Sequence, residues 1–334
     1  MKFSEAEIQV LASIHQLLDD NAVVDRAAVE ARGNHYWVFK EDWSGAFRRL
    51  VEMGLLSGDD GGYRLTDAGR PVALGCHGER PDMYWYYYQK FYPAARASAA
   101  HSTLCERVFG ENLCQEGQTD MASLEHLMAL LDVKSGDAVL DLGCGAGIIA
   151  EYVSDQTGAS VTGLDYAASA IAEAIDRTSG KRDRLTFEQG NFNALDFPER
   201  SFDAIIALDT LYWASDLAVT MSALRHALKP GGRMGVFMNH HIEEGASPDL
   251  LAVRHSKLAK AAVKSGLSLQ TFDYTKQLGA FWHRNFAAAT ALRRAFEAEG
   301  NGFIADSLIR ESEEEYLPDI EGGRVARYLY LLRC

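Results

Sequence analysis

The sequence predicts an α/β fold in which a mostly parallel sheet is covered by helices on both faces. Three observations support this prediction. From about residue 125 onward, short apolar segments typical of buried strands alternate with segments of helical periodicity. The first apolar segment, 138–142, runs directly into a glycine-rich turn that opens a helix. The segment before residue 75 has a different pattern, with helices followed by two short strands, which indicates a separate small α+β domain.

Bulk composition excludes several classes of protein. The chain has 334 residues, of which 47% are hydrophobic, and a formal net charge of -14. No apolar run reaches the roughly 18–20 residues that span a bilayer, and no secretory signal is visible, so no membrane association is expected. Strong negative charge disfavours nucleic acid as the partner. Five scattered cysteines without a C-x-x-C pair indicate no metal site and a cytoplasmic location.

Residues 1–75 resemble a winged-helix module. Ser4 and Glu7 form a capping-box pattern at the start of a helix, a third helix is expected over 42–53, and two short strands follow around a Gly/Asp turn. DNA binding is one function of such modules, and dimerisation or a lid is another. The segment carries eight basic and twelve acidic residues, which is the wrong sign for a DNA-binding surface.

Residues 76–124 are expected to form an aromatic helical connector or lid. The run Met83–Tyr88 contains four tyrosines and a tryptophan. These rings could be core between the two domains, or some of them, such as Tyr88, could cover a ligand pocket at a domain boundary. The sequence leaves both interpretations open.

The strongest local motif is VLDLGCGAG, residues 139–147. A strand that enters such a turn lets backbone amides approach a ligand closely, because no side chains intervene. The spacing is G-x-G-x-G, and Ile148 stands where a dinucleotide-binding motif would have its third glycine. A pyrophosphate-binding loop is therefore disfavoured, and no Walker motif is present.

Asp165 follows the next predicted strand, 160–164, at 22 residues after Gly143. A carboxylate at this distance can accept both hydroxyls of a ribose. A lone aspartate after a strand is usually a helix cap. Together with the glycine turn, however, Asp165 is predicted to bind a ribose.

The blocks VLDLGCGAG, VTGLD, EQGNF, FDAIIALDTLYW and LKPGGR, in this order over residues 120–240, resemble the class I S-adenosylmethionine-dependent methyltransferases of the small-molecule type. The resemblance implies S-adenosyl-L-methionine as cofactor and a Rossmann-like seven-stranded sheet over 125–334. It also implies that the last strand, Arg324–Leu332, lies antiparallel beside a strand at Phe303–Ile309.

The resemblance further implies roles for individual residues. The methionine part of the cofactor would contact Asp141 and the turn, the ribose Asp165, and the adenine Tyr166, Asn191 and Phe192. The family more often has an acidic residue at 191, but an asparagine carbonyl also accepts from an amino group. Asp209 would face cofactor or substrate, or else cap a helix, and the turn 115–117 would close over the cofactor. The full set of expected cofactor contacts is Asp141, Gly143, Cys144, Gly145, Gly147, Asp165, Tyr166, Asn191, Phe192, Asp209 and Gln115.

The acceptor side is predicted from aromatic and histidine residues. An insertion at 242–285 is expected to cap the pocket, with an auxiliary helical layer as the alternative. His240 and His241 are expected to follow the fifth strand, where one could act as a general base or simply donate hydrogen bonds. Aromatic faces suit a sulfonium or an amine. The expected pocket residues are Tyr88, Tyr212, Trp213, Tyr274 and Trp282.

The favoured function is methyl transfer from S-adenosylmethionine to a small-molecule metabolite or natural product by a protein that could be a homodimer. A winged-helix transcriptional regulator that uses the nucleotide-binding domain as a ligand sensor is the alternative, disfavoured by the acidic first module. A nicotinamide-dependent oxidoreductase is a third possibility, disfavoured by Ile148. The sequence leaves the acceptor atom open.

Overall fold

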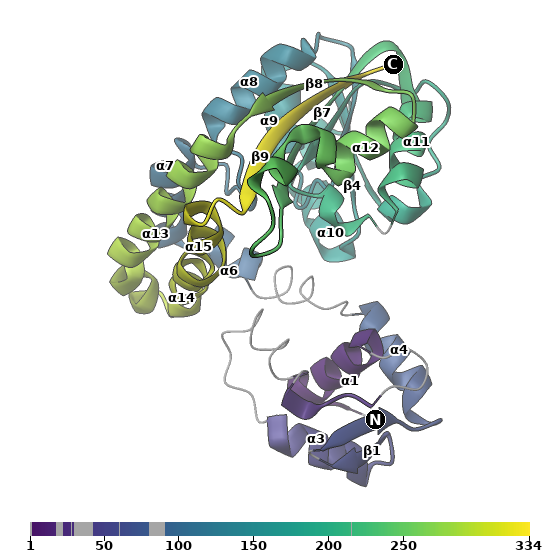
Figure 1. The fold of residues 1–334 in the computed structure, drawn as a ribbon, viewed down its shortest axis with the longest axis vertical. Helices are drawn as coiled ribbons and strands as arrows, with labels where there is room; N and C mark the ends of the chain where they lie inside the picture. Colours follow the sequence, from purple (N-terminus) through teal and green to yellow (C-terminus); the bar gives the residue numbers. More distant parts are fainter. Residues whose placement is uncertain are drawn as a thin grey trace. The chain divides into compact units, whose positions relative to one another are not determined.

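The computed structural model describes residues 2–17, 23–27, 29, 43–59, 61–79, 91–214 and 216–334. The chain forms two compact units, Met1–Ala97 and Ser98–Cys334, each with its own core (Figure 1). Within the described residues, no helix is long and apolar enough to cross a membrane.

The first unit packs helices against a two-stranded antiparallel hairpin. The capping box is confirmed, because the Glu7 amide donates to Ser4 Oγ at 3.2 Å and the Ser4 amide donates to Glu7 Oε2 at 2.6 Å. Phe47 and Leu50 are fully buried in its core. The elements are α1 (Glu5–Leu17), α3 (Trp43–Glu52), β1 (Leu56–Asp59), β2 (Gly62–Leu65), α4 (Gly69–Glu79) and α6 (Tyr92–Ala97).

The second unit contains the predicted seven-stranded sheet. Its spatial order is β5-β4-β3-β6-β7-β9-β8, with the first five strands parallel and β9 antiparallel to both its neighbours. The strand order reverses at β3, because β4 lies on one side of it and β6 on the other. In sheets of this kind the ligand crevice lies at the carboxyl ends of the strands where the order reverses. The strands are β3 (Ala138–Leu142), β4 (Ser160–Asp165), β5 (Leu185–Gln189), β6 (Phe202–Leu208), β7 (Leu228–His241), β8 (Ser268–Asp273) and β9 (Val325–Arg333).

Helices cover both faces of this sheet. Val139 and Phe237 face one layer, and Leu140 and Val236 face the other. Burial on both faces explains why the strands are continuously apolar rather than alternating. The first layer contains α8 (Met121–Leu131), α9 (Ile148–Thr157) and α10 (Ala168–Arg177), and the second contains α11 (Leu217–Ala227) and α12 (Lys257–Lys264).

The C-terminal third corrects two predictions. Residues 303–309, predicted as a strand, lie in the helix α14, and β8 pairs with β9 instead. A short apolar run cannot distinguish a strand from a helix by itself, and here Ile304, Ala305 and Ser307 are buried at helical spacing. The range 242–285, predicted as a cap insertion, contains α12 and β8, which belong to the sheet domain.

The extra helices lie instead between β8 and β9. Figure 1 shows them grouped beyond one end of the sheet, beside α7 (Ala99–Phe109). Because α13 starts directly after β8 and β9 starts directly after α15, this group lies at the edge where the parallel strands end. The group consists of α13 (Thr275–Ala298), α14 (Gly302–Arg310), the π-helix η7 (Glu311–Tyr316) and α15 (Leu317–Glu321).

Candidate functional site

The glycine turn after β3 needs glycine for both conformation and space. Gly143 and Gly147 have φ of +83° and +72°, where a side chain would be strained. A Cβ at Gly143 would lie 2.4 Å from Thr210 Cγ2, and one at Gly147 would lie 2.3 Å from the Phe187 ring. The Gly143 amide donates to the Leu164 carbonyl at 2.7 Å, which holds the turn against the end of β4.

Asp165 is the last residue of β4 and holds the turn from the other side. Its side chain accepts from the Gly145 amide at 2.8 Å and from the Ala167 amide at 2.9 Å. Although Asp165 is only 4% exposed, each carboxylate oxygen has a second lone pair. Asp165 therefore ties the turn to the next helix and can still accept hydroxyls at the crevice.

Asp141 lies on β3 beneath the turn and is fully buried. Its Oδ2 atom has no hydrogen-bond partner. Burial, followed by the charge of Asp165, raises the pKa of Asp141 to about 7. An unpartnered buried oxygen costs about 1–3 kcal/mol, so this atom is suited to a ligand that brings a positive charge or a donor. Cys144, whose amide donates to the Leu164 carbonyl at 3.1 Å, lies beside it, and burial raises the pKa of its thiol.

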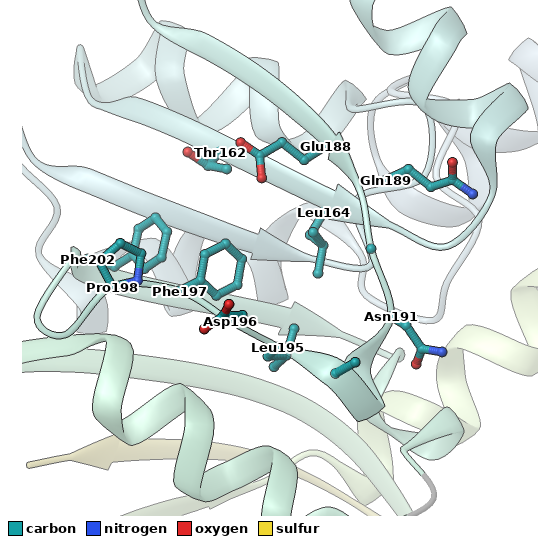
Figure 2. A pocket seen from close by; sticks show the side chains of 12 residues that line it. Thr162, Leu164, Glu188, Gln189, Asn191, Leu195, Asp196, Phe197, Pro198 and Phe202 are labelled. Atoms are coloured by element: carbon teal, nitrogen blue, oxygen red, sulfur yellow. The ribbon is translucent and has the colours of Figure 1, made fainter.

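The expected adenine side carries exposed groups. Tyr166 follows Asp165 and is exposed, Asn191 follows β5 and is exposed, and Phe192 packs partly against the core. A cavity of about 330 Å³ lies between β4, β5 and the segment 191–202, and Figure 2 shows Asn191 among the side chains that line it. No residue of the glycine turn lines this cavity, so it does not contain the whole expected site.

Asp209, after β6, is held by a buried arginine that the sequence analysis missed. Arg327 on β9 is 2% exposed and donates to both Asp209 oxygens, at 2.5 and 2.8 Å. It also donates to Asn239 Oδ1 and Thr119 Oγ1, both at 2.9 Å. Asp209 thus forms a buried ion pair and does not cap the following helix η4. Its expected contact with cofactor or substrate stays a prediction. The signal for the ion pair was a charged residue inside the apolar strand VARYLYLL.

The turn at 115–119 lies across Asp209 and the glycine turn. The Gln118 amide donates to Asp209 Oδ2 at 3.0 Å, and a Cβ at Gly117 would lie 3.1 Å from the same atom. A Cβ at Gly145 would be 3.7 Å from Glu116 Oε2. The Gln115 side chain contacts its own segment, through the Leu113 amide and Met121 Sδ.

The turn therefore lies against Asp209 and the glycine turn through its backbone and Glu116.

The aromatic residues predicted to line the substrate pocket differ in their exposure to solvent. Tyr212 and Trp213, in η4 (Leu211–Trp213), are 37% and 43% exposed at the edge where β6 ends. Tyr274 is core, because it packs on Phe237 and its hydroxyl bonds His126 at 2.5 Å, so its assignment to the pocket is wrong. Tyr88 lies outside the described residues.

Trp282 on α13 is buried and stacks on Tyr316 of the π-helix, with ring centroids 3.9 Å apart. Its Nε1 atom has no hydrogen-bond partner, and burial raises the pKa of Tyr316. Sequence reasoning did not identify Tyr316. A π-helix has no compositional signature, and such helices concentrate at functional sites.

His240 and His241 end β7 rather than follow it. His240 Nε2 lies 2.7 Å from the Leu250 carbonyl and must donate there, because a carbonyl only accepts. That nitrogen is therefore not a base in this arrangement. His241 is exposed, with Nδ1 3.4 Å from Asp319 Oδ2. The described residues contain no group of three or more side chains that could hold a metal ion.

The segment that contains the glycine turn is similar to known methyltransferases. Residues 139–232 match the family model of a methyltransferase domain. A sterol 24-C-methyltransferase of Gibberella zeae is 34% identical over 48% of this chain and 43% of its own. Phosphoethanolamine N-methyltransferase 3 of Arabidopsis thaliana is 27% identical over 48% of this chain and 33% of its own. The chain thus spans less than half of these relatives.

Solved structures share the fold. Phosphoethanolamine N-methyltransferase 2 of Haemonchus contortus, in complex with phosphomonomethylethanolamine and S-adenosylhomocysteine, superposes with a TM-score of 0.59 at 20% identity, over 74% of this chain and 60% of that one. The [4+2]-cyclase SpnF superposes with a TM-score of 0.50 at 21% identity, over 63% and 78%. The glycine turn, Asp165 and Asp209 all lie in the part of the chain that matches a methyltransferase domain.

Proposed function

We propose that this chain transfers a methyl group from S-adenosylmethionine to a small-molecule acceptor. The observation that carries the proposal is the polar geometry at the end of β3. There, a turn with glycines at 143, 145 and 147, the carboxylate of Asp165 and the unpartnered Oδ2 of Asp141 lie together. A cationic nucleoside with a ribose and an ammonium group fits these three features together.

The cofactor, when bound, supplies a methyl group on a positively charged sulfur, and the protein's part is to position and desolvate. Asp165 would accept the ribose hydroxyls, and Asn191 would accept from the adenine amino group. Asp141 would ionise and receive the ammonium group, which removes its unpartnered state. The turn at 115–119, held by Asp209, would exclude water from above.

The acceptor would lie against Tyr212 and Trp213, whose exposed faces stand at the same edge of the sheet. The helices between β8 and β9, with Trp282 and Tyr316 stacked, would form the cap that was predicted one segment earlier. For an acceptor that must lose a proton, we propose His241 as the base, with Asp319 orienting it. His240 instead holds the Leu250 carbonyl.

The decisive experiment is calorimetric titration of the full chain with S-adenosylmethionine and, separately, with NADH. Asp165→Ala removes charge-assisted hydrogen bonds worth at least about 1.5 kcal/mol, so affinity should fall roughly tenfold or more. Asp203→Ala is the matched control. Asp203 is a partly buried aspartate near the start of β6, at the opposite end of the sheet from Asp165. It accepts hydrogen bonds from the Ala138 amide and from Lys229 Nζ.

Equal affinity in wild type and Asp165→Ala would overturn the ribose assignment, and tighter binding of NADH would overturn the function. A methyl-transfer screen over a metabolite panel then identifies the acceptor.

For the first unit we propose a winged-helix-like module that dimerises the chain. Two helices, the β1–β2 hairpin and a bridge between Val24 and Tyr63 support this architecture. Its excess of acidic residues supports dimerisation over DNA binding. The alternative is a winged-helix regulator with a ligand sensor, and duplex binding with a steep salt dependence would favour it. The five free cysteines fit a cytoplasmic location.

A further inference from the structure

Two cysteines lie together at the base of the turn that covers the crevice. Cys105, near the end of α7, is fully buried, and Cys114 is partly exposed. His101 Nδ1 lies 3.6 Å from the Cys105 sulfur and 3.7 Å from the Cys114 sulfur. Both sulfurs therefore lie beside the same imidazole nitrogen.

The pair has unequal roles. Because Cys105 donates its proton toward Cys114, the hydrogen bond and burial together raise the pKa of Cys105 far above its usual range. Of the two sulfurs, Cys114 is the one that solvent reaches. A reachable thiol beside a buried partner thiol is the arrangement of a peroxide-sensitive cysteine with its resolving cysteine.

The pair is mechanically connected to the turn. Gln115 directly follows Cys114, and the next two residues, Glu116 and Gly117, lie against the glycine turn and Asp209. Cys114 itself has φ of +47°, an uncommon conformation for a side-chain-bearing residue. A disulfide draws two sulfurs to about 2.05 Å, well inside hydrogen-bonding distance, so the turn that follows Cys114 must shift.

We propose that Cys105 and Cys114 form a reversible oxidative modification site that couples hydroperoxides to the cover of the crevice. Hydrogen peroxide oxidises the Cys114 thiol to a sulfenic acid and releases one water. The Cys105 sulfur then attacks the Cys114 sulfur, the S–S bond forms, and the hydroxyl leaves as a second water. In total, two thiols lose two hydrogens and one peroxide becomes two waters.

The disulfide weakens cofactor binding, an effect that rests on the function proposed above. A displacement of the order of 1 Å in a positioning segment has large consequences in such sites, and we expect affinity for S-adenosylmethionine to fall about tenfold or more.

The test treats the full chain with hydrogen peroxide, blocks remaining thiols by alkylation and maps disulfides by mass spectrometry. S-adenosylmethionine affinity is then measured before oxidation, after oxidation and after reduction with dithiothreitol. Cys114→Ser and Cys105→Ser should each abolish the disulfide and the affinity change. Cys334→Ser, which removes an exposed thiol elsewhere, should retain both.

A 105–114 disulfide with a reversible loss of affinity supports the proposal. Oxidation of Cys334 without that disulfide overturns it, and a disulfide that leaves affinity unchanged overturns the coupling to the crevice. If the reduced chain binds no S-adenosylmethionine but still forms the disulfide, the modification site stands and the proposed function fails.

Discussion

The buried ion pair between Arg327 and Asp209 predicts how much the second unit loses in stability when one partner is removed. We expect Arg327→Met to destabilise the second unit by about 3–5 kcal/mol, the range for breaking a buried ion pair at one partner. Both side chains are almost fully buried, at 2% and 8% exposure, and the guanidinium contacts Asp209 Oδ1 at 2.5 Å. Two charges about 4 Å apart attract by about 4 kcal/mol at an effective dielectric constant of about 20, which agrees with this range.

The loss arises chiefly because Asp209 would remain buried without its partner. In Arg327→Met, Asp209 would keep only neutral donors, namely the Gln118 amide, the Thr119 hydroxyl and, weakly, Tyr212. Adding Asp209→Asn removes the stranded charge, so the double variant should lose less than the sum of the single variants, by about 1–3 kcal/mol.

Urea unfolding followed by hydrogen-exchange mass spectrometry is the suitable assay, because peptides from β7 and β9 report on the second unit alone. Arg324→Met is the matched control. Arg324 directly precedes the same strand, but its partner Asp319 is a third exposed, and such pairs contribute about 0–1 kcal/mol. Additive losses in the double variant, or a loss in Arg327→Met no larger than in Arg324→Met, would refute the reasoning.

Two further predictions concern the crevice itself. Because the pKa of Asp141 is raised from 3.8 to about 7, its protonated form is favoured in the folded chain, so its contribution to stability is complete below pH 3.8 and is lost as pH rises through 7. Asp141→Asn should therefore flatten the fall in unfolding free energy across this window, measured by urea titration, and an unchanged slope would contradict the buried acid. Gly147→Ala, which forces a Cβ to within 2.3 Å of Phe187, should destabilise the chain more than Gly136→Ala, which has positive φ but open space, and equal melting temperatures would show that conformation alone matters.

Local sequence patterns were enough to predict the features that are formed by residues close together in the chain. The glycine turn, the strand before it and Asp165 at the end of the next strand could all be placed from spacing. The reason is that a parallel strand, its turn and its helix are adjacent in sequence and obey one handedness. The capping box of Ser4 and Glu7 was predictable for the same reason.

Tertiary structure alone decided the remainder, because long-range contacts leave little trace in a local pattern. The partner of Asp209 is 118 residues away on β9, so the sequence predicted a ligand contact, with a helix cap as the alternative, and did not predict the ion pair. Tyr274 and Trp282 look alike as aromatics of one segment and both are buried, but Tyr274 packs on Phe237 of the sheet and Trp282 stacks on Tyr316 of the π-helix. Residues 268–273 form the strand beside β9, and residues 303–309 lie in a helix. Both are short runs with buried apolar side chains, so the sequence pattern could not distinguish them, and only the hydrogen bonds to β9 identify the strand.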